Sequence, residues 1–291
     1  MTPICKHDLS KRLAMAASSA AILFVAGCAT APAPAPAPAE PQRTAADLLS
    51  PLAVPTASLT AQDPGITALA AALSGAKLIG FMGTGTGSQE DALLKSALTE
   101  VLTERYHLGA VILDTPCAGA NELDAYIGGA QTGELAADVV GAAHIAGVYK
   151  TAALADLLTM LRGWNAIYAD APVRVAGYGC ETARMVPPGR PAIFWGFTES
   201  PADMGEKMRA AQARGEVPAE PFVWLVQVSG ETAADIIPAT GWIDMRALPD
   251  DPLVADWREA AGPGNAVLRA DHPWSADIVF RHPDPTPAEA P

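Results

Sequence analysis

The chain has 291 residues, of which 50% are hydrophobic, and it carries a formal net charge of -13. Residues 1–27 carry three basic residues and one acidic residue, which leaves the rest of the chain near -15. Such a surface repels nucleic acid and anionic lipid headgroups, so we expect neither as a binding partner. The length suits one sizeable domain rather than several.

The first 28 residues have the layout of a secretory signal. Lys6, Lys11 and Arg12 precede an apolar run from Leu13 to Ala26, which is too short to span a membrane. The run ends in Val25-Ala26-Gly27-Cys28, which resembles the lipobox of bacterial lipoproteins. The resemblance implies a signal peptide over residues 1–27, cleavage before Cys28 and lipidation of its thiol. The alternative is an ordinary signal peptide that contains a chance cysteine.

The anchor is therefore expected to be the lipid alone, since no second hydrophobic span follows. Ala29, rather than Asp, follows the lipidated cysteine, and this favours the outer membrane, facing either the periplasm or the cell surface. Alternating Ala and Pro over 31–38 form a spacer in residues 28–43, because this pattern favours extended polyproline II. We expect a folded domain over 44–281 and a loose, Pro-rich tail over 282–291.

Apolar runs alternate with helical periodicity along the domain, which predicts an α/β fold with a mostly parallel sheet flanked by helices. The expected strands are 78–82, 110–114, 172–176, 192–195, 222–228, 243–246 and 277–280. The expected helices are 45–52, 67–74, 89–105, 121–127, 135–146, 151–164, 204–214 and 253–261.

A glycine-rich turn joins the strand at 78–82 to the helix that Ser88 is expected to cap. Gly83, Gly85 and Gly87 suggest a phosphate loop, and Thr84, Thr86 and Ser88 are candidate ligand-binding residues. However, Lys95 lies too far inside the helix for a P-loop, and Ser88 stands where the dinucleotide fingerprint has Gly or Ala. We therefore expect no nucleotide, no other cofactor and no metal.

A series of segments resembles, in its order, the erythromycin esterase family and, more distantly, the haem-uptake and TIKI-like α/β proteins. The resemblance implies an erythromycin-esterase-like fold. The segments that carry it are Gly83–Glu90, Val111–Asp114, Leu123–Gly129, Tyr149–Leu154, Leu161–Asn165, Pro172–Gly177, Ile243–Pro249, Trp257 and Thr286–Ala288.

The departures from this family fall on the residues of its chemistry. Thr84 occupies the position of the family's first Glu. The family's His is either deleted in this chain or replaced by Gly87. With that deletion the last Glu of the motif is Glu90, whereas an ungapped alignment places Asp91 there. The second-strand Glu is Asp114.

A later H-N-x-H motif would fall on 228–231, where neither histidine is present. Since a histidine near neutral pH is the group best suited to activate water, we expect a pseudoenzyme rather than a hydrolase.

Glu90 and Asp114 follow strands that we expect to be neighbours, so they could perform acid–base chemistry or hold a hard cation. The alternative is that Glu90 caps a helix and Asp114 bonds a loop. A hydrolase that uses Glu90, Asp114 and Glu231 is the second functional hypothesis. The third is a purely structural envelope protein. The leading hypothesis is a lipid-anchored envelope protein that binds a small ligand or an envelope partner.

Cys117 and Cys180 are the cysteines that remain after Cys5 is removed with the signal and Cys28 is lipidated. Each follows a predicted strand in a chain expected to reach an oxidising compartment. They can form a disulfide if their Cα atoms lie within about 7 Å. Two isolated thiols or a thiol metal site are the alternatives.

Overall fold

The structure is a computed structural model that describes residues 43–83, 87–130, 133–177, 180, 189–196, 210, 213, 222–229, 233–260 and 276–291. Arg43–Pro291 forms one compact unit. The signal peptide, Cys28 and the Ala/Pro spacer lie outside the described residues, as does the helix expected at 204–214, so these stay predictions. Within the described ranges, no helix is both long and apolar enough to cross a membrane.

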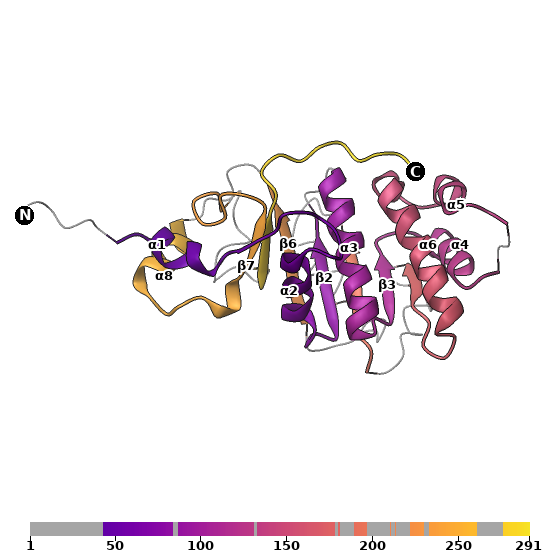
Figure 1. The fold of residues 1–291 in the computed structure, drawn as a ribbon, viewed down its shortest axis with the longest axis horizontal. Coiled ribbons are helices and arrows are strands. Elements are labelled where there is room, and N and C mark those ends of the chain that lie inside the picture. Colours follow the sequence, from indigo (N-terminus) through magenta and orange to yellow (C-terminus); the bar gives the residue numbers. More distant parts are fainter. Residues whose placement is uncertain are drawn as a thin grey trace, which may run out of the picture. The chain divides into compact units, whose positions relative to one another are not determined.

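A mixed, mostly parallel sheet of eight strands forms the centre of the unit, which confirms the predicted α/β class (Figure 1). The six strands from β8 to β4 in the order β8-β6-β2-β5-β3-β4 are parallel, whereas β7 and β1 continue the sheet beyond β8 in antiparallel pairs. The bounds are β1 Val54–Pro55, β2 Leu78–Met82, β3 Ala110–Leu113, β4 Arg174–Gly177, β5 Ala192–Gly196, β6 Phe222–Val228, β7 Gly241–Asp244 and β8 Ile278–Arg281.

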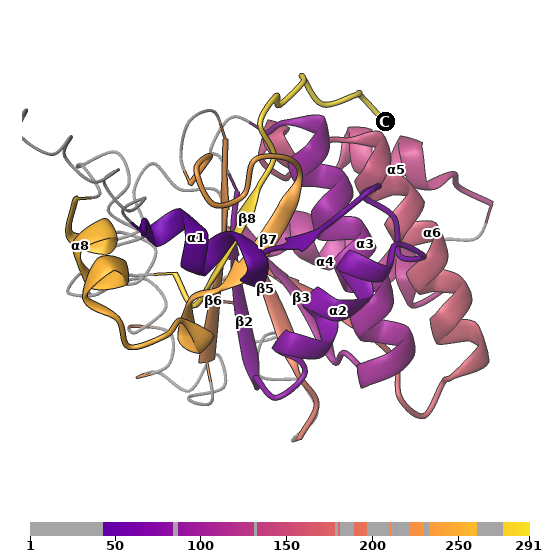
Figure 2. The same cartoon turned by 60° about the vertical axis from the view of Figure 1, so that its left-hand side comes forward.

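Helices cover both faces of the sheet. Helices α2 to α6 pack on one face, and α1 and α8 pack on the other (Figure 2). The bounds are α1 Ala45–Leu49, α2 Pro64–Leu73, α3 Gln89–Tyr106, α4 Cys117–Ile127, α5 Ala136–Ala142, α6 Ala152–Ile167 and α8 Pro252–Ala260, with short 3-10 helices at Ser50–Leu52, Gly147–Tyr149 and Met245–Ala247.

Strand β2 shows why the apolar runs were recognisable as strands. Ile79 and Phe81 enter the core beneath α2 to α6, whereas Leu78 and Met82 enter the core on the opposite face. All five of its residues are buried, as expected of a strand in a parallel sheet that is covered on both sides. The chain reaches β3 and β4 on one side of β2 and β6 and β8 on the other. Strand β2 is therefore a topological switch point, next to which ligands bind in open α/β sheets.

Residues 282–291, which we predicted to be a loose tail, are instead held against the domain; we call them the C-terminal strap. The strap crosses the ends of α3 and α6 (Figure 1). The backbone N–H of Gln89 donates to Thr286 O at 2.8 Å, and that of Ala152 donates to Glu289 O at 3.0 Å. These N–H groups begin two helices and have no acceptor within them, so the strap satisfies both. The prolines prevent regular structure in the strap but leave its carbonyl groups free to accept hydrogen bonds.

Several element boundaries also differ from the prediction, among them those of β7 and α4. The strand expected at 243–246 begins at Gly241, and Met245 already belongs to a 3-10 helix. The Asp244 carboxylate explains this end, because it accepts a hydrogen bond from the backbone N–H of Arg246. Helix α4 begins at Cys117 rather than at residue 121.

Candidate functional site

The candidate site is the edge of the sheet at which the parallel strands β6, β2, β5, β3 and β4 reach their carboxyl ends. The start of α3 and the start of α4 follow this edge directly. In open α/β sheets this edge is where loops and helix N-termini converge on ligands. We refer to it as the carboxyl edge.

Glu90 lies at the start of α3 and is committed to the C-terminal strap. Its Oε2 accepts the backbone N–H of Thr286 at 2.7 Å, and its Oε1 accepts the hydroxyl of Thr286 at 2.7 Å. Burial raises the pKa of Glu90, but these hydrogen bonds to its charged form outweigh burial and lower the pKa below its ordinary value of 4.5. Glu90 therefore does structural work: besides holding the strap, its carboxylate accepts a hydrogen bond from its own backbone N–H in the first turn of α3.

Acid should loosen this contact. Because folding lowers the pKa of Glu90, the contact contributes its full stability above pH 4.5, and this contribution is lost as the pH falls through the lower, folded-state pKa. We expect wild type to be more stable than Glu90→Gln at pH 6, and the difference to shrink towards pH 3, as measured by urea unfolding. A difference that does not depend on pH would show that the charge of Glu90 plays no part.

Asp91 and Lys95 form a buried ion pair one turn apart on α3. Lys95 Nζ lies 2.8 Å from Asp91 Oδ2, and the two side chains are 0% and 1% exposed. The ammonium also donates to Gly196 O at 3.3 Å and lies 5.1 Å from the centre of the Phe81 ring. Burial lowers the pKa of Lys95. The negative charge of Asp91 and its hydrogen bond raise this pKa, but by less than burial lowers it. The lysine that seemed misplaced for a phosphate loop therefore ties α3 to the ends of β2 and β5.

Gly83 directly follows strand β2 and lies against this ion pair. A Cβ atom at Gly83 would lie 2.0 Å from Asp91 Oδ1, which is far inside van der Waals contact. The first glycine of the turn is therefore required for the close approach of Asp91. Ser88, a candidate ligand-binding residue, accepts the backbone N–H of Asp91 at 3.1 Å and so caps α3, as predicted from its position.

Asp114 follows β3 and is joined to the site by Tyr149. The Tyr149 hydroxyl accepts the backbone N–H of Asp114 at 3.0 Å and donates to the Trp195 carbonyl of β5. Burial raises the pKa of Tyr149 well above 10, and the negative charges of Asp114 and Asp91 add to this effect, so the hydroxyl stays protonated and can donate. This buried tyrosine joins the ends of β3 and β5.

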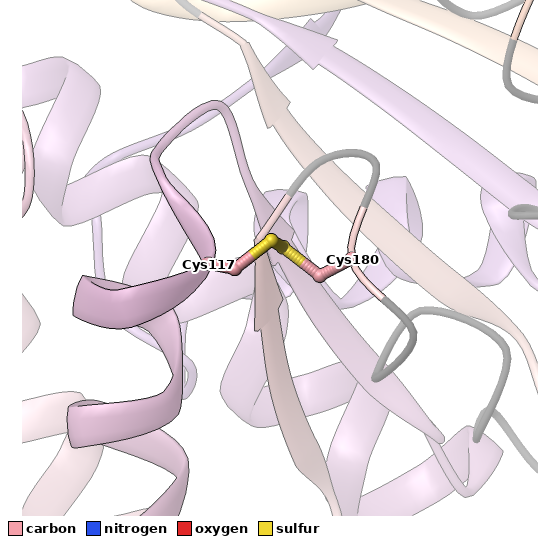
Figure 3. Close-up of a disulfide and its surroundings, with 2 residues drawn as sticks. All are labelled: Cys117 and Cys180. Carbon is pink, nitrogen blue, oxygen red and sulfur yellow. A yellow bond between two sulfur atoms is a disulfide. The ribbon is translucent and has the colours of Figure 1, made fainter.

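Cys117 and Cys180 form a disulfide at the rim of the carboxyl edge (Figure 3). Their Cα atoms lie 5.6 Å apart, so the two alternatives, isolated thiols and a thiol metal site, do not describe this structure. The bond joins the first residue of α4 to the segment that follows β4. A Cβ atom at Gly177 would lie 2.7 Å from Cys180 Sγ, so a glycine at the end of β4 makes room for the bond.

Three candidate residues, Thr84, Thr86 and Glu231, lie outside the described residues. The sequence did not single out Lys95, Tyr149 or Thr286 as members of the site. Thr286 and Tyr149 each gave a usable signal, because they open the Thr286–Ala288 and Tyr149–Leu154 segments of the resemblance. Asp91 lies only four positions from Lys95, but the other acceptor of Lys95, Gly196, and the acceptor of Tyr149, Trp195, belong to strand β5, more than 40 residues away, and no local pattern shows them.

Comparisons with known proteins show the fold but no family. No family model matches the chain, and no curated protein matches it either. A solved structure of a protein from Bacillus cereus superposes with a TM-score of 0.60 at 13% identity, covering 84% of this chain and 98% of that one. A structure described as a succinoglycan biosynthesis protein also superposes with a TM-score of 0.60, at 10% identity, covering 84% and 97%. At these identities the likeness concerns the fold alone.

Proposed function

We propose that the chain is a lipid-anchored envelope protein with an erythromycin-esterase-like domain that binds a small ligand at the carboxyl edge without hydrolysing it. The observation that carries this proposal is the contact between Glu90 and Thr286. Both carboxylate oxygens of Glu90 accept hydrogen bonds from the strap, which removes this residue from the role of a general base. The absence of histidine from 228–231 supports the same conclusion.

The disulfide supports an exported protein. Stable disulfides between Cys117 and Cys180 require an oxidising compartment, which agrees with the secretory signal and the lipobox-like segment at Cys28. Incorporation of radiolabelled palmitate, its loss in Cys28→Ala and recovery of the wild-type chain in the outer membrane fraction would test the anchor.

An esterase assay tests the lack of catalysis. The full chain should hydrolyse neither p-nitrophenyl acetate nor a macrolide lactone above the rate of the buffer, because Thr286 donates hydrogen bonds to both carboxylate oxygens of Glu90. The alternative, a hydrolase that uses Glu90, Asp114 and Glu231, predicts turnover that disappears in Glu90→Gln and in Asp114→Asn. Such turnover would overturn the proposal. A matched control is Glu104→Gln on the far end of α3.

A further inference from the structure

Besides the half-buried His282 (Nδ1), which follows β8, four buried side chains at the carboxyl edge carry polar atoms with no hydrogen-bond partner in the part of the chain that the structure describes. We call them the edge cluster: Asp91 (Oδ1), Thr115 (Oγ1), Trp195 (Nε1) and Gln227 (Oε1 and Nε2). Their exposed fractions are 1%, 6%, 2% and 3%. Buried polar groups are nearly always paired in folded proteins, so a group of unpaired ones requires an explanation.

The sheet places the edge cluster on one face, across four adjacent strands. Gln227 follows Val223 and Leu225 on the face of β6 that α2 to α6 cover, because side chains alternate along a strand. Strand β6 pairs Val226 with Met82, so Gln227 comes level with Gly83, over which Asp91 Oδ1 lies.

Trp195 lies on the same face of the next strand, where β5 pairs it with Phe81 and with Leu113 of β3. Thr115 follows Leu113 by two residues. The edge cluster thus extends over neighbouring strands, which lie about 4.8 Å apart.

The neighbouring polar groups show that this edge is otherwise well paired. Lys95 has Asp91 and Gly196 as partners, and Tyr149 has Asp114 and Trp195 O. The unpaired atoms therefore do not reflect a general lack of partners in this region. They are what a polar ligand at the switch point of the sheet would contact.

We propose that the edge cluster binds a neutral sugar, and this inference rests on the ligand-binding function proposed above. Asp91 Oδ1 requires a donor, Trp195 Nε1 requires an acceptor, and Gln227 offers both. A hydroxyl group donates and accepts, so a polyhydroxylated ligand can satisfy all three. An anion is disfavoured because Glu90, Asp91 and Asp114 lie at the same edge and Lys95 is already paired with Asp91.

Calorimetric titration of the full chain tests this inference with three probes: N-acetylglucosamine, glucose and inorganic phosphate. We expect at least one sugar to bind and phosphate not to bind. In Gln227→Met the affinity for the sugar should fall about tenfold, because a buried hydrogen-bonding pair is lost. The same variant should unfold at a higher temperature in the absence of sugar, because its side chain no longer buries an unpaired amide.

Thr99→Val is the matched control. Thr99 Oγ1 is also buried and unpaired among the described residues, but it lies in the middle of α3, away from the edge. This variant should unfold at a higher temperature and bind sugar as the wild type does.

Each other outcome contradicts a different statement. Binding of phosphate without binding of either sugar would overturn the sugar inference. The proposed ligand-binding function would still agree with that result. No binding of any probe would overturn the inference, whereas ester hydrolysis would overturn the proposed function itself. If Gln227→Met lowers the stability and leaves sugar affinity unchanged, Gln227 has a structural role and the edge cluster is not the site.

Discussion

Replacement of Lys95 by Met should destabilise the domain by about 3–5 kcal/mol, because it leaves the buried carboxylate of Asp91 without its counter-charge. Lys95 and Asp91 are 0% and 1% exposed, so water cannot take the place of the ammonium without opening the start of α3. The loss should appear as a lower midpoint of urea unfolding with an unchanged slope. The effect is large because the charge that remains on Asp91 is buried and unpaired. The ion pair itself contributes less than this to the free energy of unfolding.

Two further variants separate these contributions. Lys77→Met is the matched control, since Lys77 makes an exposed hydrogen bond to Gly189 O and should cost less than about 1 kcal/mol. Asp91→Asn in the Lys95→Met background removes the remaining charge and should restore more than half of the lost stability. If Lys95→Met costs no more than Lys77→Met, then the buried pair does not hold α3 on the sheet.

The α/β fold could be predicted from the sequence because its signals are local. Strand β2 has the bounds that its apolar run predicted, and Ser88 caps α3 from the position that the spacing indicated. Each of these depends on residues within a few positions of one another, since burial on both faces gives a continuous apolar run and a helix needs an acceptor at its start.

The candidate site could be predicted only in part, because its partners come from distant segments. Glu90 was conspicuous in the sequence as an acid at a helix start, but its partner Thr286 is 196 positions away in the strap. A Pro-rich ending without apolar residues is typical of a loose tail. The strap is held because the first backbone N–H groups of α3 and α6 need acceptors, which its carbonyl groups provide. Whether the strap can reach both groups depends on how α3 and α6 are placed in space.

The disulfide could be predicted better than the partner of Glu90, but less well than strand β2 or the cap of α3. That Cys117 and Cys180 each follow a strand made a bond geometrically possible, but the sequence could not establish the order of the strands. Strands β3 and β4 turn out to be neighbours in the sheet, with Leu113 opposite Gly177, and this places the two cysteines at one edge. The glycine at 177 is a local sign of the same contact, because a larger residue would meet Cys180 Sγ.

Removal of the disulfide should destabilise the domain by about 4 kcal/mol, because the bond closes a long loop in the unfolded chain. The cysteines are separated by 63 positions, and the entropy that an unfolded chain regains on release grows with this length. We expect Cys117→Ala/Cys180→Ala to unfold at a markedly lower urea concentration than the wild type. Cys28→Ala should not, since Cys28 takes no part in this bond.

The single variants Cys117→Ala and Cys180→Ala decide whether the crosslink is the cause. Either one breaks the bond, so each should cost nearly as much as the pair, and the two losses should not add. Additive losses would instead mean that the cysteines act as separate packed side chains. Reduction of the wild type should reproduce the double variant and should leave Cys117→Ala/Cys180→Ala unchanged. Faster amide hydrogen exchange at the start of α4 would then show that the bond holds the rim of the carboxyl edge.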